Sequence, residues 1–135
     1  MTLLSLHPDT ETTWERVCLL QDLLPERGAA AIVDGVQVAL FRLADDTVHV
    51  IQQLDPFSGA NVMSRGLVGT RGGAATVAGP MYKQVFDLAT GRCLDEAGYS
   101  PRPGIAADLA TWPVAVHDGV VHVGHAPATD AGDAA

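Results

Sequence analysis

Two stretches of this sequence decide the fold. The first reads Leu54-Asp55-Pro56-Phe57-Ser58-Gly59-Ala60 and opens an irregular segment, rich in small residues, that extends to Arg65. The second reads Gly79-Pro80-Met81-Tyr82-Lys83-Gln84-Val85-Phe86-Asp87-Leu88-Ala89-Thr90-Gly91. In the second stretch a β-prone run over residues 84–88 is followed by a turn at residues 89–91, which small and polar residues favour. The sequence therefore predicts two Gly- and Pro-containing loops supported by short strands.

The rest of the chain reads as more short strands separated by turns. We expect strands over residues 14–20, 29–33, 36–43, 47–54, 67–70, 74–78, 84–88, 92–94, 111–117 and 120–125. Asp34-Gly35 and Asp118-Gly119 are dipeptides that favour two-residue hairpin turns. Val48 and Val50 alternate with His49, a pattern typical of a strand with one buried and one wet face. Turn signals spaced by roughly 8–12 residues indicate an all-β sandwich or small barrel of antiparallel strands.

The chain is short enough to form one domain. It has 135 residues, of which 47% are hydrophobic and 18% charged, which suits a compact protein with its own core. We assign the folded domain to residues 14–125, a flexible N-terminus to residues 1–13 and a disordered tail to residues 126–135. No apolar run approaches the ~20 residues of a membrane-spanning helix, and the N-terminus lacks the features of a signal peptide. We therefore expect a cytoplasmic protein.

The charge of the chain excludes two classes of partner. The net charge is −8, Lys83 is the only lysine, and the seven arginines are scattered. Nucleic acids and anionic membranes are bound by clustered basic residues, so neither is expected as a partner. The acidity promotes solubility and favours association with a basic protein surface.

No group of residues predicts a catalytic, cofactor-binding or metal site. His122 and His125 form the only close histidine pair, and their odd spacing puts them on opposite faces of a strand. Cys18 and Cys93 are far apart in sequence and are interpreted as reduced core thiols. The adjacent acids at residues 45–46 and 95–96 read as a turn and a solvated loop.

The two stretches quoted above resemble the cluster-binding loops of Rieske proteins. In that family the first loop reads Cys-x-His and is followed by small residues, and the second reads Cys-Pro-x-His and is followed by a strand and a turn. Gly59-Ala60 keeps the small residues, Pro80 keeps the proline, and Phe86 to Gly91 keeps the strand and turn. The resemblance implies an all-β, Rieske-like fold that retains both loops.

The same alignment implies that the cluster ligands are missing. Asp55 and Phe57 stand at the first Cys and His positions, and Gly79 and Tyr82 stand at the second pair. A Rieske [2Fe–2S] cluster takes two thiolates on one iron and two imidazoles on the other. These four degenerate positions supply neither group, so we expect no cluster in this chain.

A Rieske-like domain with these loop sequences resembles the small subunit of assimilatory NAD(P)H-dependent nitrite reductase. The resemblance runs from about Trp14 to Val123 and includes residues 38–42, 55–57, 64–67 and 79–84. It implies a large-subunit partner that carries sirohaem, an iron–sulfur cluster and FAD, uses NAD(P)H, and reduces nitrite to ammonia. The small subunit would then have no cofactor and no catalytic residue of its own.

The loop tips are the candidate partner interface. Apolar and basic side chains gather there in the sequence, at Phe57, Met63, Arg65, Met81, Tyr82 and Lys83. Phe57, Met63, Met81 and Tyr82 could instead pack the two loops together. Two other functions remain open: a cluster-free binding module that acts without a nitrite reductase, and a Rieske-type ferredoxin that carries electrons, which would require a different loop register.

Overall fold

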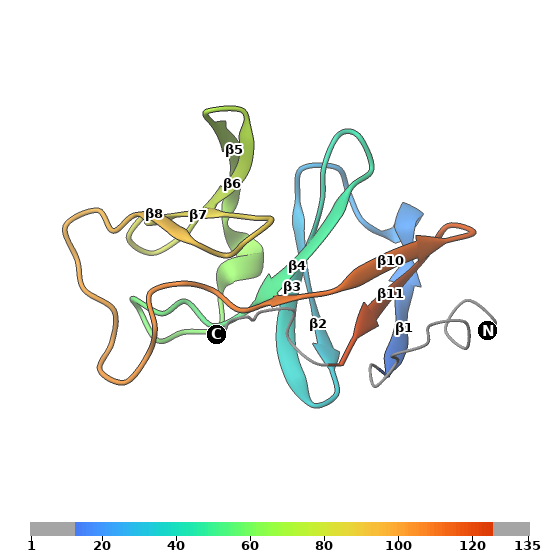
Figure 1. The fold of residues 1–135 in the computed structure, drawn as a ribbon, viewed down its shortest axis with the longest axis horizontal. Coiled ribbons are helices and arrows are strands. Elements are labelled where there is room, and N and C mark those ends of the chain that lie inside the picture. Colours follow the sequence, from blue (N-terminus) through green and yellow to red (C-terminus); the bar gives the residue numbers. More distant parts are fainter. Residues whose placement is uncertain (1–12, 126–135) are drawn as a thin grey trace.

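The computed structural model describes residues 13–125 and shows three antiparallel sheets, drawn in Figure 1. The predicted ends, residues 1–13 and 126–135, fall outside this part except for Thr13. The first sheet has the order β1 (Trp14–Leu19), β11 (Val120–Gly124) and β10 (Val114–His117). The second has the order β2 (Gly28–Val33), β3 (Val36–Arg42), β4 (Val48–Gln52) and β9 (Thr111–Trp112). The third has the order β5 (Leu67–Arg71), β6 (Ala74–Ala78), β7 (Val85–Asp87) and β8 (Cys93–Asp95). The predicted all-β fold of short antiparallel strands is confirmed.

The hairpins form where the turn dipeptides predict them. Asp34 and Gly35 have φ angles of 49° and 79° and join β2 to β3. Asp118 and Gly119 have φ angles of 54° and 73° and join β10 to β11. Positive φ at both central residues matches the right-handed twist of the paired strands.

The second sheet lies between two hydrophobic clusters. Val38 and Leu40 of β3 pack into a cluster shared with the first sheet, and β4 contributes Val48 and Val50 to it. Their neighbours Ala39, Phe41 and Ile51 pack into a second cluster on the opposite face, which is shared with the third sheet. The predicted wet face of β4 is therefore wrong: Ile51 is fully buried and His49 is partly buried. A strand covered on both faces carries apolar residues at successive positions, as residues 50–51 do.

The predicted strand over residues 111–117 is divided between two sheets. Thr111 and Trp112 pair with β4, whereas residues 114–117 pair with β11. Pro113 stands at the break, and its carbonyl accepts the N–H of Gly124 at 2.9 Å. Because proline has no N–H to donate, it interrupts a ladder, and the chain changes sheets at this residue.

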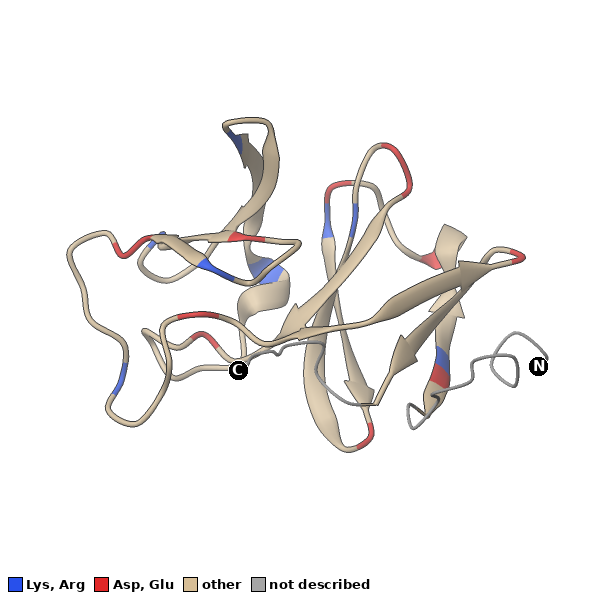
Figure 2. Ribbon diagram, in the orientation of Figure 1, with Lys and Arg blue, Asp and Glu red and all other residues tan. Residues whose placement is uncertain are grey.

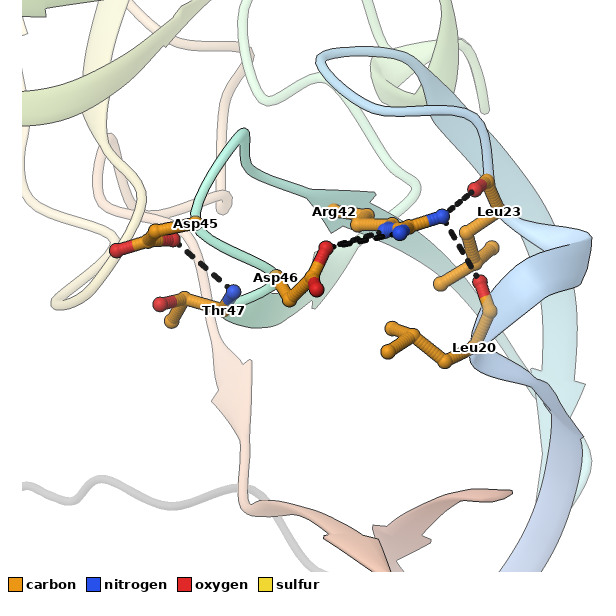
Figure 3. Close-up of polar contacts among 6 residues, drawn as sticks. All are labelled: Leu20, Leu23, Arg42, Asp45, Asp46 and Thr47. Atoms are coloured by element: carbon orange, nitrogen blue, oxygen red, sulfur yellow. Dashed lines mark hydrogen bonds and ion pairs between the residues drawn. The ribbon is translucent and has the colours of Figure 1, made fainter. Parts of the chain in front are cut away.

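Arg42 links the end of β3 to the segment after β1. Its guanidinium donates to the carbonyl oxygen of Leu23 at 2.9 Å and pairs with Asp46 at 2.8 Å, as Figure 3 shows. The short 3₁₀ helix η1 (Leu20–Asp22) lies in this segment. The predicted turn at residues 45–46 is confirmed, and hydrogen bonds from Thr47 lower the pKa of Asp45. Both aspartates thus have structural roles.

Two connections beside the third sheet carry the four ligand positions. We define the first loop as residues 53–66, between β4 and β5, and the second loop as residues 79–84, between β6 and β7. The first loop contains a 3₁₀ helix that its composition did not predict, η2 (Met63–Arg65). Both loops lie on the side of the molecule that carries the third sheet (Figure 1).

Candidate functional site

Asp55 organises the first loop. Its N–H donates to the carbonyl of Ala60 at 2.8 Å, and its own carbonyl accepts the N–H of Gly59 at 2.8 Å. Oδ1 of Asp55 accepts the N–H of Phe57 at 2.9 Å. An aspartate readily accepts from a backbone N–H two residues later, which favours a turn here. The carboxyl group is fully buried as a result.

The second loop is a tight turn closed by Gly79. The N–H of Gly79 donates to the carbonyl of Gln84 at 2.8 Å, and the N–H of Lys83 donates to the carbonyl of Gly79 at 3.1 Å. Lys83 has a φ angle of 65°, which turns the chain back toward β7. The residues between these ends project outward, and Met81 is 52% exposed.

The four degenerate ligand positions do not share one environment. Asp55 and Gly79 face each other, because a Cβ placed on Gly79 would lie 3.8 Å from Oδ2 of Asp55. Phe57 points into the second hydrophobic cluster, where its ring centroid lies 6.2 Å from that of Phe86. Tyr82 points away from the core and stacks on Tyr99 with ring centroids 4.7 Å apart. The structure thus brings the two cysteine positions together and sends the two histidine positions in opposite directions.

Two buried oxygens meet at the point where the loops touch. Oδ2 of Asp55 and Oε1 of Gln84 have no hydrogen-bond donor among the described residues. Both lie within 3.9 Å of the position that a Cβ on Gly79 would take. Sequence reasoning did not identify Gln84, because the polar residue at the start of a predicted strand has no distinguishing pattern.

These residues do not fit a Rieske-type cluster. The cluster needs two thiolates and two imidazoles, and Asp55, Phe57, Gly79 and Tyr82 supply neither group. The aromatic ring of Phe57 is fixed in the core. Cys18 lies on β1 and Cys93 on β8, both are unpaired thiols, and burial raises the pKa of each. Neither thiol lies on the two loops.

The predicted interface residues divide into a buried and an exposed group. Phe57 is 4% exposed and Met63 is fully buried, so neither presents its side chain to a partner, and their place in the predicted interface is corrected. The physical reason is that both fill the core beneath the loops, beside Phe86. Arg65, Met81, Tyr82 and Lys83 are exposed, and their role as an interface stays a prediction.

Two further residues support the loops. Gln53 is 5% exposed; its Nε2 donates to Oγ of Ser64 at 2.8 Å and its Oε1 accepts the N–H of Ser64 at 2.7 Å. Arg102, from the connection before β9, donates its N–H to the carbonyl of Pro56 at 2.8 Å. Both contacts join segments that are separated in sequence, so no local pattern predicts them.

The described residues contain no group of three or more His, Cys, Asp or Glu side chains arranged to hold a metal ion. Within residues 13–125 there is also no helix with the length and apolarity that crossing a membrane requires. The partly buried carboxylate–histidine contact between Glu15 and His125, at 3.0 Å, joins β1 to the residue after β11 and involves neither loop.

The fold and the paired loops define a Rieske-like domain, and a family model described as a Rieske-like [2Fe-2S] domain matches residues 13–124. A nitrite reductase (NADH) small subunit of Salmonella typhimurium is 37% identical over 111 residues, which cover 82% of this chain and 95% of the relative. A solved structure of an NADH-dependent nitrite reductase small subunit from Mycobacterium tuberculosis is 44% identical, covers 85% of this chain and 96% of that one, and has a TM-score of 0.74. The chain belongs to the family of nitrite reductase small subunits.

Two other similarities bear on the site. A nitrite reductase [NAD(P)H] large subunit of Klebsiella oxytoca contains a segment 38% identical to this chain over 112 residues, which is 11% of that protein. A ferredoxin of carbazole 1,9a-dioxygenase from Nocardioides aromaticivorans has a TM-score of 0.64 at 24% identity, which shows the common fold.

Proposed function

We propose that this chain is a non-catalytic small subunit that binds the large subunit of an NAD(P)H-dependent nitrite reductase, which converts nitrite to ammonia. Sirohaem, the iron–sulfur cluster, FAD and the NAD(P)H site then belong to the large subunit. The observation that carries the proposal is the similarity over most of the chain to nitrite reductase small subunits. We further propose that the complex works in the cytoplasm, with neither nucleic acid nor membrane as a partner.

The Klebsiella protein supports association with a large subunit. There a segment similar to this chain is part of a polypeptide named as the large subunit. Covalent linkage keeps two domains at a high effective concentration, which favours their association in that protein and supports association of the separate chains here.

The side chains at the ligand positions support a chain without a cluster. Asp55, Phe57, Gly79 and Tyr82 supply no thiolate and no imidazole. A role as a ferredoxin-like electron carrier has only the shared fold in its favour, and fold alone does not establish function.

The test is to purify the tagged chain from its native host, record its absorption spectrum and iron content, and identify any partner. We expect a colourless small chain that copurifies with a sirohaem-containing large subunit. Brown, iron-containing protein purified without a partner would overturn the proposal in favour of electron transfer.

The catalytic part of the proposal is tested by comparing nitrite reduction by the large subunit with and without this chain. We expect the isolated small subunit to have no activity with NADH or NADPH. Nitrite reduction by the small subunit alone would contradict its assignment as non-catalytic.

A further inference from the structure

We infer that the hollow between the β5–β6 hairpin and the second loop is the docking site for an acidic segment of the large subunit that is flanked by apolar side chains. This inference rests on the proposed function and names the surface and the chemistry of the contact. We call this surface the basic hollow; its volume is about 390 Å³ and it is lined by Arg65, Leu67, Ala78, Gly79, Pro80 and Lys83.

The lining combines an apolar floor with two cations. Leu67, Ala78 and Pro80 provide carbon surface, and Leu67 is 77% exposed, the highest value among the exposed large hydrophobic residues of the described chain. Arg65 and Lys83 are the only charged residues of the lining. In a bound segment, an acidic side chain would pair with the two cations. An apolar side chain next to it would cover the exposed surface of Leu67.

The two cations are available to a partner. Within residues 13–125 no ion pair involves Arg65 or Lys83, whereas Arg42 and Arg71 pair with Asp46 and Asp95. A cation already paired within its own chain would have to break that contact before it could bind a partner. Arg65 and Lys83 do not carry this cost.

The backbone at both basic residues is fixed before binding. Arg65 ends η2, and Gly66 next to it packs so closely that a Cβ would lie 2.6 Å from Val77. Lys83 sits in the closed turn that begins at Gly79. A fixed backbone loses little conformational entropy on association, so the ordering cost at these residues is confined to their side chains.

The second loop also carries one residue of an exposed aromatic pair. Tyr82 and Tyr99 stack with an interplanar angle of 16°, and both are partly exposed, at 39% and 50%. Met81 adjoins them at the loop tip. Tyrosine and methionine are enriched in protein–protein interfaces, so the second loop presents both basic and aromatic side chains to a partner.

The distribution of charge favours an acidic partner at this end of the molecule. Residues 53–110 carry five basic and five acidic side chains, of which Asp55 is buried. The two sheets formed by residues 13–52 and 111–125 carry three basic and seven acidic side chains. Figure 2 shows this contrast between the two ends. The net acidity that predicts a basic partner thus lies away from the loops, and an acidic segment meets least repulsion at the basic hollow.

The test measures binding of the full chain to the purified large subunit by calorimetry at low and high salt. Reversing both cations, Arg65→Glu with Lys83→Glu, is expected to raise Kd by about tenfold or more. The matched control is Arg16→Glu with Arg27→Glu, which makes the same change of charge at an exposed residue of β1 and at the exposed residue before β2. It should leave Kd within about threefold. Salt should weaken the wild-type complex more than the hollow variant.

A second pair of variants tests the apolar floor. Leu67→Ser is expected to raise Kd by about fivefold or more, whereas Ile32→Ser, a substitution at a 63% exposed residue of β2, should not. Thermal unfolding of all variants checks that the fold is kept.

The outcomes separate this inference from the proposed function. If wild-type chain fails to bind the large subunit, both are overturned. If it binds and the hollow variant binds equally well, only the inference is overturned. Self-association of the wild-type chain that the hollow substitutions abolish would identify a second copy of the chain as the occupant. Competition by phosphate or nitrite alone would identify a site for small anions. Either result would overturn the assignment of an acidic segment of the large subunit to the basic hollow.

Discussion

Asp55 and Gln84 each lack a hydrogen-bond donor for one buried oxygen, and a single substitution can test the effect on stability. Each has a buried oxygen without a donor among the described residues, and the two oxygens face the same point beside Gly79. Asp55→Asn keeps the oxygen that accepts the N–H of Phe57 and adds an N–H₂ group beside Gln84. We expect this variant to equal or exceed wild type in free energy of unfolding, by up to about 1 kcal/mol, in urea titrations.

The control for this prediction is Asp55→Ala, which removes both oxygens. It leaves the buried N–H of Phe57 without its acceptor and should cost about 1–3 kcal/mol. If Asp55→Asn lost as much as Asp55→Ala, the buried carboxylate itself would be needed, and the hydrogen-bond count would be the wrong explanation.

Two glycines outside the strands, Gly79 and Gly91, should respond differently to alanine. Gly91 has a φ angle of 78°, and a Cβ there would lie 2.0 Å from the carbonyl oxygen of Leu109. Gly91→Ala should therefore cost about 3 kcal/mol or more, or prevent folding. At Gly79 a Cβ would make only ordinary contacts, at 3.8 Å and beyond. Gly79→Ala should stay within about 1 kcal/mol of wild type in the same urea titration; a large loss at residue 79 would contradict the geometry of the second loop.

At the scale of elements, the two loops place their aromatic residues in opposite environments. Phe57→Asp puts a charge into the second hydrophobic cluster and should cost about 3–5 kcal/mol. Tyr82→Asp exchanges an exposed ring that contacts Tyr99 and should cost about 1 kcal/mol or less. Chemical unfolding of the isolated domain measures both.

Phe57 is a candidate interface residue by sequence, but the structure places it in the second hydrophobic cluster. Phe57 is 4% exposed, so its substitution acts first on stability. Equal stability of the two variants would mean that the first loop does not contribute Phe57 to the core.

Most elements were predictable from sequence, and the exceptions have a common cause. The hairpin strands follow local turn preferences, as at Asp34-Gly35. The change of sheet at Pro113 and the helix at Met63–Arg65 were missed. Both are stabilised by distant segments: β4 and β11 hold the two halves of the divided strand, and Gln53 bonds to Ser64 within the helix. Local propensity does not report contacts of this kind.

At the scale of the whole molecule, His49 makes stability depend on pH. Burial lowers the pKa of His49 below its ordinary value, and Asp87 and Asp45 only partly oppose this. The unfolded chain therefore binds a proton near the ordinary pKa of about 6.5, while the folded chain still excludes it. Stability should fall as the pH decreases through about 6.5 toward the lower folded-state pKa.

The check is urea unfolding at about pH 7.5 and about pH 5.5 for wild type and for His49→Gln. Glutamine does not titrate, so the loss of stability between the two pH values should be smaller in the variant. An identical loss in both proteins would assign the pH dependence to other groups.

The sequence by itself determined the positions of most strands along the chain, the hairpin turns and the side chains at the four ligand positions. It did so because turn preferences and donor atoms are properties of short segments. Only the tertiary structure decided that Phe57 turns inward while Tyr82 turns outward, and that Asp55, Gly79 and Gln84 meet. It also decided that Arg65, Leu67 and Lys83 line one hollow. These arrangements depend on packing between segments that are distant in the chain, and no periodic pattern in the sequence predicts such packing.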